Sequence, residues 1–247
     1  MPSRTKERNP ARLAVRDVNP KHKSKRVIIA IDGPAGAGKS TIARMVAQKL
    51  GILYIDTGAM YRALTLKALR EGVDCSDERT LSALLKKTRI DLVYAQDGAL
   101  RVFLDNEDVS ADIRKPQITR FVSDVAKVPG VRKQMLLLQR RLGMKSSCIL
   151  DGRDIGTVVF PHAEKKFFLD ANFKERVGRR HKELQLTGQK VSFQDVEKDL
   201  SNRDTIDSTR ACAPLKKAPD AIYVDTTDMT INEVVETLLG YIESSSR

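Results

Sequence analysis

The sequence contains no tryptophan, only three histidines and three cysteines, and no long apolar run among its 247 residues. Cys75, Cys148 and Cys212 lie far apart and form no C-x-x-C pair, which argues against a disulfide scaffold and against a zinc module. No stretch approaches the roughly 20 apolar residues that a membrane-spanning helix needs, so the sequence excludes an integral membrane protein. We expect a monomeric, cytoplasmic protein without membrane contact.

Positive charge is in excess and is unevenly distributed. The formal net charge is +12, and residues 1–26 carry +7 of it, because they hold nine Lys and Arg against two acidic residues. With three prolines and no apolar segment, this stretch is neither a secretory signal nor a core element, and we interpret it as a disordered basic arm. A solvated tail is favoured over loose attachment to nucleic acid, since no aromatic residue interleaves the charges. A transit peptide is a weaker third interpretation.

The rest of the chain, residues 27–247, alternates short apolar runs with apolar residues at helical spacing. Helices are expected at 39–50 and 60–70, over much of the charged segment 172–207, and after a capping box formed by Thr230 and Glu233. This alternation predicts an α/β fold with a five-stranded parallel sheet and helices on both faces. The expected strands are residues 27–32, 52–56, 148–151, 166–170 and 221–225.

Residues 74–147 have a different pattern, which indicates an insertion. A helix is expected around 81–85, and the runs 90–94 and 100–104 form a hairpin around Asp97-Gly98, a strong turn signal. Two more helices are expected at 117–127 and 131–142, separated by Pro129-Gly130. The insertion is therefore expected to carry its own small antiparallel element.

A phosphate-binding motif follows the first expected strand. Residues 33–40 read GPAGAGKS, which satisfies G-x-x-x-x-G-K-[ST] between a strand and a helix. Glycines let backbone N–H groups turn toward phosphate oxygens, a lysine reaches the β- and γ-phosphates, and a serine hydroxyl is a Mg²⁺ ligand. The motif predicts a P-loop NTPase that binds ATP with Mg²⁺. The expected ATP-binding residues are Gly33, Pro34, Ala35, Gly36, Ala37, Gly38, Lys39, Ser40 and Thr41.

The class of P-loop protein is narrowed by what is missing. No N-K-x-D motif is present, and no D-x-x-G follows where GTPases carry it, so a small-molecule kinase is the leading class. Two polar motifs, DTGAMYR at 56–62 and DGRDIG at 151–156, follow expected parallel strands directly. Ligands bind at this end of α/β sheets, so both motifs are candidates for the acceptor site.

Taken together, five ordered motifs resemble the bacterial cytidylate kinases, a family of the nucleoside monophosphate kinase group. They are IDGPAGAGKST, DTGAMYR, LDGRDIGTVVFP, KFFLDA, and NRDTIDSTR followed by APL, and the resemblance runs from about Val27 to Ile242. It implies a kinase domain over 27–247 with an acceptor-binding insertion at 58–147 and a lid at 173–190. It further implies transfer of a phosphoryl group from ATP to CMP or dCMP. No general base is then required, because the attacking oxygen belongs to an ionised phosphate.

The resemblance also implies roles for individual residues. Lys39, Arg62, Arg153 and Asp151 would be catalytic, with Ser40 and Asp151 at the metal, although Arg62 alone also fits a surface arginine and Asp151 a turn carboxylate. Arg176, Arg179 and Arg180 lie in the lid segment, where some would reach ATP; Arg179 and Arg180 are the candidates retained. The implied CMP-binding residues are Thr57, Tyr61, Arg62, Ser123, Arg132, Arg153, Asp154, Arg203, Asp207 and Arg210.

Some alternatives stay open on the sequence. If residues 203–210 are helical, then Arg203, Asp207 and Arg210 share one face, where a surface ion pair is the plain explanation. Another small-molecule P-loop kinase would carry the same phosphate loop. An ATP-regulated nucleic-acid-binding protein is suggested by the +12 charge, although only +5 remains outside the arm.

Overall fold

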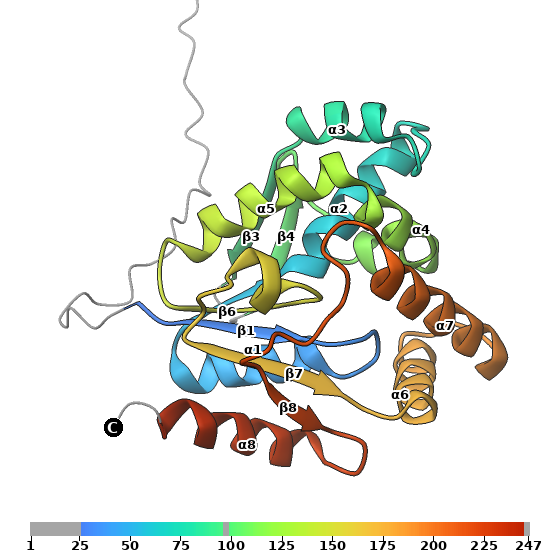
Figure 1. The fold of residues 1–247 in the computed structure, drawn as a ribbon. Coiled ribbons are helices and arrows are strands. Elements are labelled where there is room, and N and C mark those ends of the chain that lie inside the picture. Colours follow the sequence, from blue (N-terminus) through green and yellow to red (C-terminus); the bar gives the residue numbers. More distant parts are fainter. Residues whose placement is uncertain (1–25, 96–98, 245–247) are drawn as a thin grey trace, which may run out of the picture.

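The computed structural model describes residues 26–95 and 99–244 of the chain (Figure 1). The expected basic arm, apart from Arg26, and the turn at Asp97-Gly98 lie outside the described residues. Within them, a main sheet of five strands is present with helices on both of its faces, as predicted. The strands of this sheet are β1 (Ile28–Asp32), β2 (Leu53–Asp56), β6 (Cys148–Gly152), β7 (Lys165–Asp170) and β8 (Ile222–Asp225).

All neighbouring strands of the main sheet run parallel, in the order β2-β6-β1-β7-β8. Strand β1 is central, and its last residue, Asp32, is paired with Gly152 of β6 and Phe168 of β7. Because the strands are parallel, their carboxyl ends meet along one edge of the sheet. The segments that follow β1, β2, β6 and β8 are therefore brought together at that edge.

Two layers of helices cover the sheet. Helices α1 (Lys39–Leu50) and α8 (Ile231–Glu243) lie on one face, and α2 (Thr57–Arg70) and α5 (Pro129–Gly143) lie over the other (Figure 1). Side chains alternate along a strand, so Ile29 and Ile31 join the apolar cluster of α1 and α8, whereas Ile28 and Ala30 join the opposite cluster. Both faces of β1 are buried, which explains its unbroken apolar sequence.

The insertion has its own antiparallel sheet, as expected, with strand order β3-β4-β5. Its apolar residues, such as Leu81, Val102 and Ile118, belong to the same cluster as Met60 and Leu64 of α2. The insertion therefore shares its core with α2 and the main sheet. Its elements are α3 (Glu78–Lys86), β3 (Ile90–Tyr94), β4 (Leu100–Leu104), β5 (Glu107–Asp108), the 3₁₀ turn η1 (Asp112–Arg114) and α4 (Pro116–Lys127).

Two helix starts differ from expectation. Helix α2 begins at Thr57 rather than Met60, because the Asp56 carboxylate accepts a hydrogen bond from the N–H of Ala59. The two helices expected around Pro129-Gly130 are separate, but the break between them is at Val128, since α4 ends at Lys127 and α5 already starts at Pro129. Proline is tolerated in the first turn of a helix, where its missing N–H has no intrahelical partner.

The segment expected to be largely helical between 172 and 207 contains two helices. They are α6 (Phe173–Leu186) and α7 (Phe193–Thr209), and the turn between them contains Gly188 with a positive φ of 77°. After β6 comes a single π-helical turn, η2 (Ile155–Val159), whose first two N–H groups donate to the carboxylate of Asp32. No helix in the described parts of the chain is long and apolar enough to cross a membrane.

Candidate active site

A cleft of about 1050 Å³ lies along the carboxyl edge of the main sheet, between the phosphate loop, α2, α6, α7 and the insertion. Its lining includes every residue expected to bind ATP, CMP or metal except the first two of the phosphate loop, Gly33 and Pro34. Four expected segments, from the ends of β1, β2 and β6 and from α7, thus meet in one cavity. The structure brings together residues that are more than 150 positions apart in the chain.

The phosphate loop connects β1 to α1. Gly36 and Gly38 both have φ of 79°, the left-handed conformation that glycine adopts without strain. Gly33 has another role, because a Cβ at this position would lie 1.9 Å from the Leu169 carbonyl oxygen of β7. The Lys39 ammonium donates to the Pro34 carbonyl oxygen over 2.6 Å. Burial, together with the nearby charge of Arg153, lowers the pKa of Lys39.

Asp151, at the end of β6, is held by two hydroxyl groups. Ser40 Oγ donates to Asp151 Oδ2 over 2.8 Å, and the Tyr54 hydroxyl donates to Asp151 Oδ1 over 2.9 Å. Burial raises the pKa of this carboxyl group, and the charge of Asp56 adds to the effect. A serine hydroxyl and a carboxylate are hard oxygen donors beside the phosphate loop, which suits Mg²⁺, a cation that keeps several of its waters. Among the described residues, no three His, Cys, Asp or Glu side chains form a metal cluster.

Four arginines of the cleft influence one another electrostatically. Burial, and then the charges of Arg203 and Arg180, lower the pKa of Arg62 to about 9. Burial and the charge of Arg153 also lower the pKa of Arg203. Arg62 donates to Thr119 Oγ1 over 2.8 Å. Positive charges that destabilise one another in a buried cleft are a site for a polyanion, because an anion relieves the repulsion.

A chain of alternating charges leads away from these arginines. Asp207 Oδ2 accepts from Arg153 Nε over 2.7 Å, and Asp207 Oδ1 from Arg210 over 3.4 Å. Arg210 lies 3.6 Å from Asp154, whose other oxygen accepts from Arg132 over 2.6 Å. Although burial opposes it, the charge of Arg153 holds the pKa of Asp207 below its usual value.

Three arginines of the cleft each have a buried nitrogen atom without a hydrogen-bond partner. These atoms are Arg132 Nε, Arg203 Nε and Arg210 Nη2. All three residues line the cleft. Since buried polar atoms in folded proteins are nearly always hydrogen-bonded, these donors point to a polar ligand with several acceptor atoms.

The remaining expected acceptor residues also have defined surroundings. The Thr57 hydroxyl donates to the Asp151 carbonyl oxygen over 2.6 Å, and the Arg132 guanidinium lies 5.8 Å from the ring centre of Tyr61. Ser123 is buried in the lining. The surface ion pair considered for Arg203 and Asp207 is not what the structure shows, because Asp207 pairs with Arg153 and Arg210 instead.

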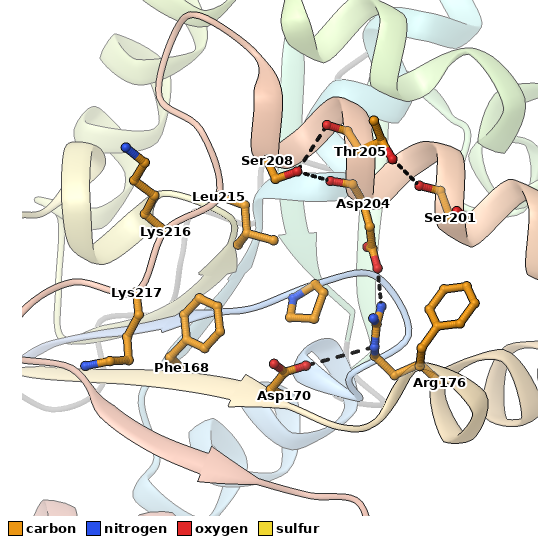
Figure 2. A pocket seen from close by; sticks show the side chains of 12 residues that line it. Phe168, Asp170, Arg176, Ser201, Asp204, Thr205, Ser208, Leu215, Lys216 and Lys217 are labelled. Atoms are coloured by element: carbon orange, nitrogen blue, oxygen red, sulfur yellow. Dashed lines mark hydrogen bonds and ion pairs between the residues drawn. The ribbon is translucent and has the colours of Figure 1, made fainter.

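The lid arginines separate into two groups. Arg179 and Arg180 line the cleft, and Arg179 donates to Thr226 Oγ1 over 2.9 Å. Arg176 does not line this cleft; it contacts the outer side of the phosphate loop (Figure 2). Of the three lid arginines, Arg179 and Arg180 are therefore the ones that line the cleft in this structure.

Sequence reasoning missed several cleft residues and two residues that form hydrogen bonds at the carboxyl edge of the sheet. The segment between β8 and α8 was not considered, although β8 is a strand of the predicted parallel sheet and its carboxyl end had to reach the same edge. Asp32 and Tyr54 were also missed, because each acts through a contact with a distant residue. Among the missed cleft residues are Thr226, Met229 and Thr230 of this segment, together with Ile231 and Val234 at the start of α8.

Comparison with known proteins gives consistent results. The sequence model of the family described as cytidylate kinase matches residues 29–244. The chain is 50% identical over 219 residues to a cytidylate kinase of Halalkalibacterium halodurans, covering 89% of this chain and 98% of that protein. It is 51% identical over 215 residues to a cytidylate kinase of Bacillus pumilus, covering 87% and 95%. A shikimate kinase from Acinetobacter baumannii in complex with shikimate is similar with a TM-score of 0.46 and 15% identity, covering 89% and 94% of the two chains.

Proposed function

The chain belongs to the cytidylate kinase family, and from this premise we propose that it transfers the γ-phosphoryl group of ATP to CMP or dCMP, giving ADP and CDP or dCDP. The observation that carries this proposal is the meeting of a phosphate loop and an arginine cluster in one cleft. Two polyphosphate-binding elements that face the same space suit an enzyme that moves a phosphoryl group between two nucleotides. None of the residues described in the cleft lining is a histidine, and none is needed, since the attacking phosphate oxygen is already ionised.

The phosphate loop and the lid would hold ATP. The backbone N–H groups of residues 36–41 and the Lys39 ammonium neutralise the β- and γ-phosphates, and Arg179 and Arg180 approach from α6. Burial lowers the pKa of Lys39, so binding of an anion favours its charged form.

The opposite side of the cleft would hold the acceptor. Arg62 and Arg153 bind its phosphate in pairs of hydrogen bonds, because a planar guanidinium matches two phosphate oxygens. Arg203, Asp207 and Arg210 lie beside this position and suit the ribose. Asp154 accepts a hydrogen bond from the cytosine N4 amine, while Arg132 donates toward N3 or O2.

Ser40 and Asp151 would hold Mg²⁺, which neutralises charge on the transferring phosphoryl group. The structural support is the 2.8 Å contact between the two side chains at the start of α1. Tyr54 keeps Asp151 oriented toward this position.

Residues 27–247 would act as one kinase domain, with the acceptor-binding insertion at 58–147 and the lid at 173–190. The lid arginines are carried by α6, and the phosphate-clamping Arg62 by α2. We expect the enzyme to work in the cytoplasm, where its nucleotide substrates are found, and to do so as a monomer.

The test is a panel of phosphate acceptors. Purified protein is mixed with ATP and Mg²⁺, and CMP, dCMP, UMP or AMP is added in separate reactions. ADP release is followed by a coupled assay, and the diphosphate product is identified by chromatography. We expect CMP and dCMP to give the highest kcat/KM.

A second measurement makes the result decisive. If ADP forms at the same rate without any acceptor, the chain is an ATPase under these conditions and the proposal fails. If another acceptor exceeds CMP and dCMP, the chain is a kinase of a different nucleotide. RNA added at increasing salt tests the nucleic-acid alternative, which requires tight and salt-dependent binding.

A further inference from the structure

The backbone of Ala35, inside the phosphate loop, is bound by two side chains from helices far away in the sequence. The Ala35 N–H donates to Asp204 Oδ1 of α7 over 3.3 Å. The Ala35 carbonyl oxygen accepts from Arg176 Nη1 of α6 over 2.9 Å. Both hydrogen-bonding groups of one loop residue are therefore fixed by charged side chains, and charge-assisted hydrogen bonds are the stronger kind.

The two side chains also bind each other. Arg176 Nη1 donates to Asp204 Oδ2 over 2.5 Å, while Arg176 Nε donates to the Ala171 carbonyl oxygen over 3.0 Å. Figure 2 shows the Arg176 guanidinium linked to Asp204 and to Asp170, and Arg176 Nε lies 3.9 Å from Asp170 Oδ1. Arg176 is buried, so its partners cannot be exchanged for water without cost.

Close packing reinforces these contacts. A Cβ added to Gly36 would lie 2.9 Å from the Arg176 carbonyl oxygen and 3.2 Å from Leu200 Cδ2. Ala35 belongs to a small apolar cluster with Val177, Val196 and Leu200 of α6 and α7. The loop and the two helices thus meet without space for relative sliding.

The same helices carry arginines of the cleft. Arg179 and Arg180 follow Arg176 by three and four residues, so they lie about one turn further along the same side of α6. Arg203 directly precedes Asp204 in α7. The position of Arg176 and Asp204 on the loop therefore sets the position of these three arginines relative to any phosphate that the loop binds.

We propose that Arg176 and Asp204 are positioning residues for ATP: they fix the Ala35–Gly36 backbone of the phosphate loop and set the register of α6 and α7 on it. The proposal rests on the proposed function for the identity of the nucleotide. Neither side chain lines the cleft in which the nucleotides are expected. They act through the loop backbone on one side and through the cleft arginines on the other.

The test uses three variants and one control in the full chain. Arg176→Lys keeps the charge but cannot donate to Ala35, Ala171 and Asp204 in the planar arrangement of a guanidinium. Asp204→Asn keeps the shape of the side chain, but asparagine has only one side-chain oxygen. Its NH₂ group then faces one of the two donors, the Ala35 N–H or the Arg176 guanidinium. Arg176→Met removes the positive charge and all hydrogen bonds of the guanidinium. Val196→Ala is the control, because it weakens the same apolar cluster without changing a polar contact to Ala35.

Two measurements on each protein separate positioning from stability. Hydrogen exchange of the loop amides at 35–38 is followed without nucleotide, and dissociation constants for ATP and CMP are measured by calorimetry. We expect the loop amides to exchange faster in all three variants and the Kd for ATP to rise about 10- to 100-fold. The Kd for CMP should rise less than the Kd for ATP, because Arg62, Arg153 and Asp154 on the acceptor side are carried by neither α6 nor α7.

Two outcomes overturn the proposal. If loop exchange and ATP affinity of the variants match those of Val196→Ala at equal loss of stability, the pair is only structural. If Arg176→Lys equals wild type in both measurements, bridging by the guanidinium is not needed. Should Arg176→Met fail to fold, the other two variants decide. If wild-type protein binds ATP but does not phosphorylate CMP, the proposed function fails. The role of Arg176 and Asp204 is still tested in that case by loop exchange and ATP affinity.

Discussion

Asp154 and Arg132 form a buried ion pair, in which the Arg132 guanidinium donates to Asp154 Oδ2 over 2.6 Å. Both residues line the cleft. Arg132 also donates to the Ala126 carbonyl oxygen, and Arg132 Nε has no partner. The two residues that we expect to read the base are thus oriented by each other, and changing one of them also changes the other.

This pairing determines how base selection should be tested. Asp154→Ala would leave a buried guanidinium unpaired, so Asp154→Asn is the better variant. Asparagine presents either an oxygen to the amine of CMP or an amino group to the carbonyl of UMP. We expect the ratio of kcat/KM for CMP over UMP to fall about 10- to 100-fold, with ATP affinity unchanged. Equal losses for both acceptors in steady-state kinetics would show that Asp154 does not read the base.

A second prediction concerns Lys39. Lys39→Met retains most of the buried stem but removes the charge that faces the phosphates. We expect phosphoryl transfer to slow by at least about 10²- to 10³-fold, the cost of losing a positioned charge at the transition state. Thermal unfolding is the control, since the fold should persist. Near-normal kcat in a folded variant would remove the lysine from the mechanism.

A third prediction concerns Tyr54. In Tyr54→Phe, Asp151 loses one of its two hydroxyl donors, and its pKa, already raised by burial, rises further. The Mg²⁺ concentration for half-maximal activity should increase about tenfold, because a protonated carboxyl group is a poor ligand. Magnesium titration monitored by calorimetry with ATP present gives a readout independent of turnover.

Tyr94→Phe is the matched control for Tyr54→Phe. The Tyr94 hydroxyl bonds to the backbone N–H and carbonyl oxygen of Tyr54, but it does not contact Asp151. It should reduce stability without changing the Mg²⁺ requirement. Equal effects of the two variants on Mg²⁺ would mean that the anchoring of β2, rather than the Tyr54 hydroxyl, supports Asp151.

A fourth prediction concerns stability against pH. Burial raises the pKa of Asp32 from 3.8 to about 6, despite hydrogen bonds from the N–H groups of Gly156 and Ile155. Between these pH values the folded chain binds more protons at Asp32 than the unfolded chain does. This contribution to stability is complete below about pH 4, and it is lost as pH rises through 6.

Urea unfolding of wild type and Asp32→Asn at several pH values measures this contribution. The stability of wild type relative to the variant should fall by up to about 3 kcal/mol between pH 4 and pH 7. A difference that stays constant over this range would show that Asp32 titrates normally. Asparagine does not titrate, so the variant is a reference that lacks this pH-dependent contribution.

Most of the fold follows from local sequence. An apolar run before a glycine cluster fixed β1 and the phosphate loop, and alternation of such runs with helical spacing predicted the parallel sheet. The Asp56 cap was missed, and the helix was expected to start at Met60, although aspartate before a helix is a common start signal. The error at Pro129 arose because proline ends one helix as readily as it begins the next.

Site residues that belong to a short sequence motif could be predicted. Residues whose role depends on a contact with a distant part of the chain could not. Arg176, Arg179 and Arg180 look alike in the sequence, and only the packing of α6 on the phosphate loop separates the first from the other two. Asp32 meets Ile155 across 123 positions of the chain. No local pattern encodes a partner at that distance.

The shared core of the insertion and α2 has a consequence for how the chain unfolds and how it can be engineered. Ile118 and Val102 fill the same apolar cluster as Leu64, so removing residues 74–147 would expose one face of the main sheet. The insertion cannot be exchanged between related enzymes as a cassette unless α2 is exchanged with it. Chemical denaturation followed by circular dichroism and by a probe placed in the insertion should therefore give coincident transitions, because the two parts lose their packing in one event.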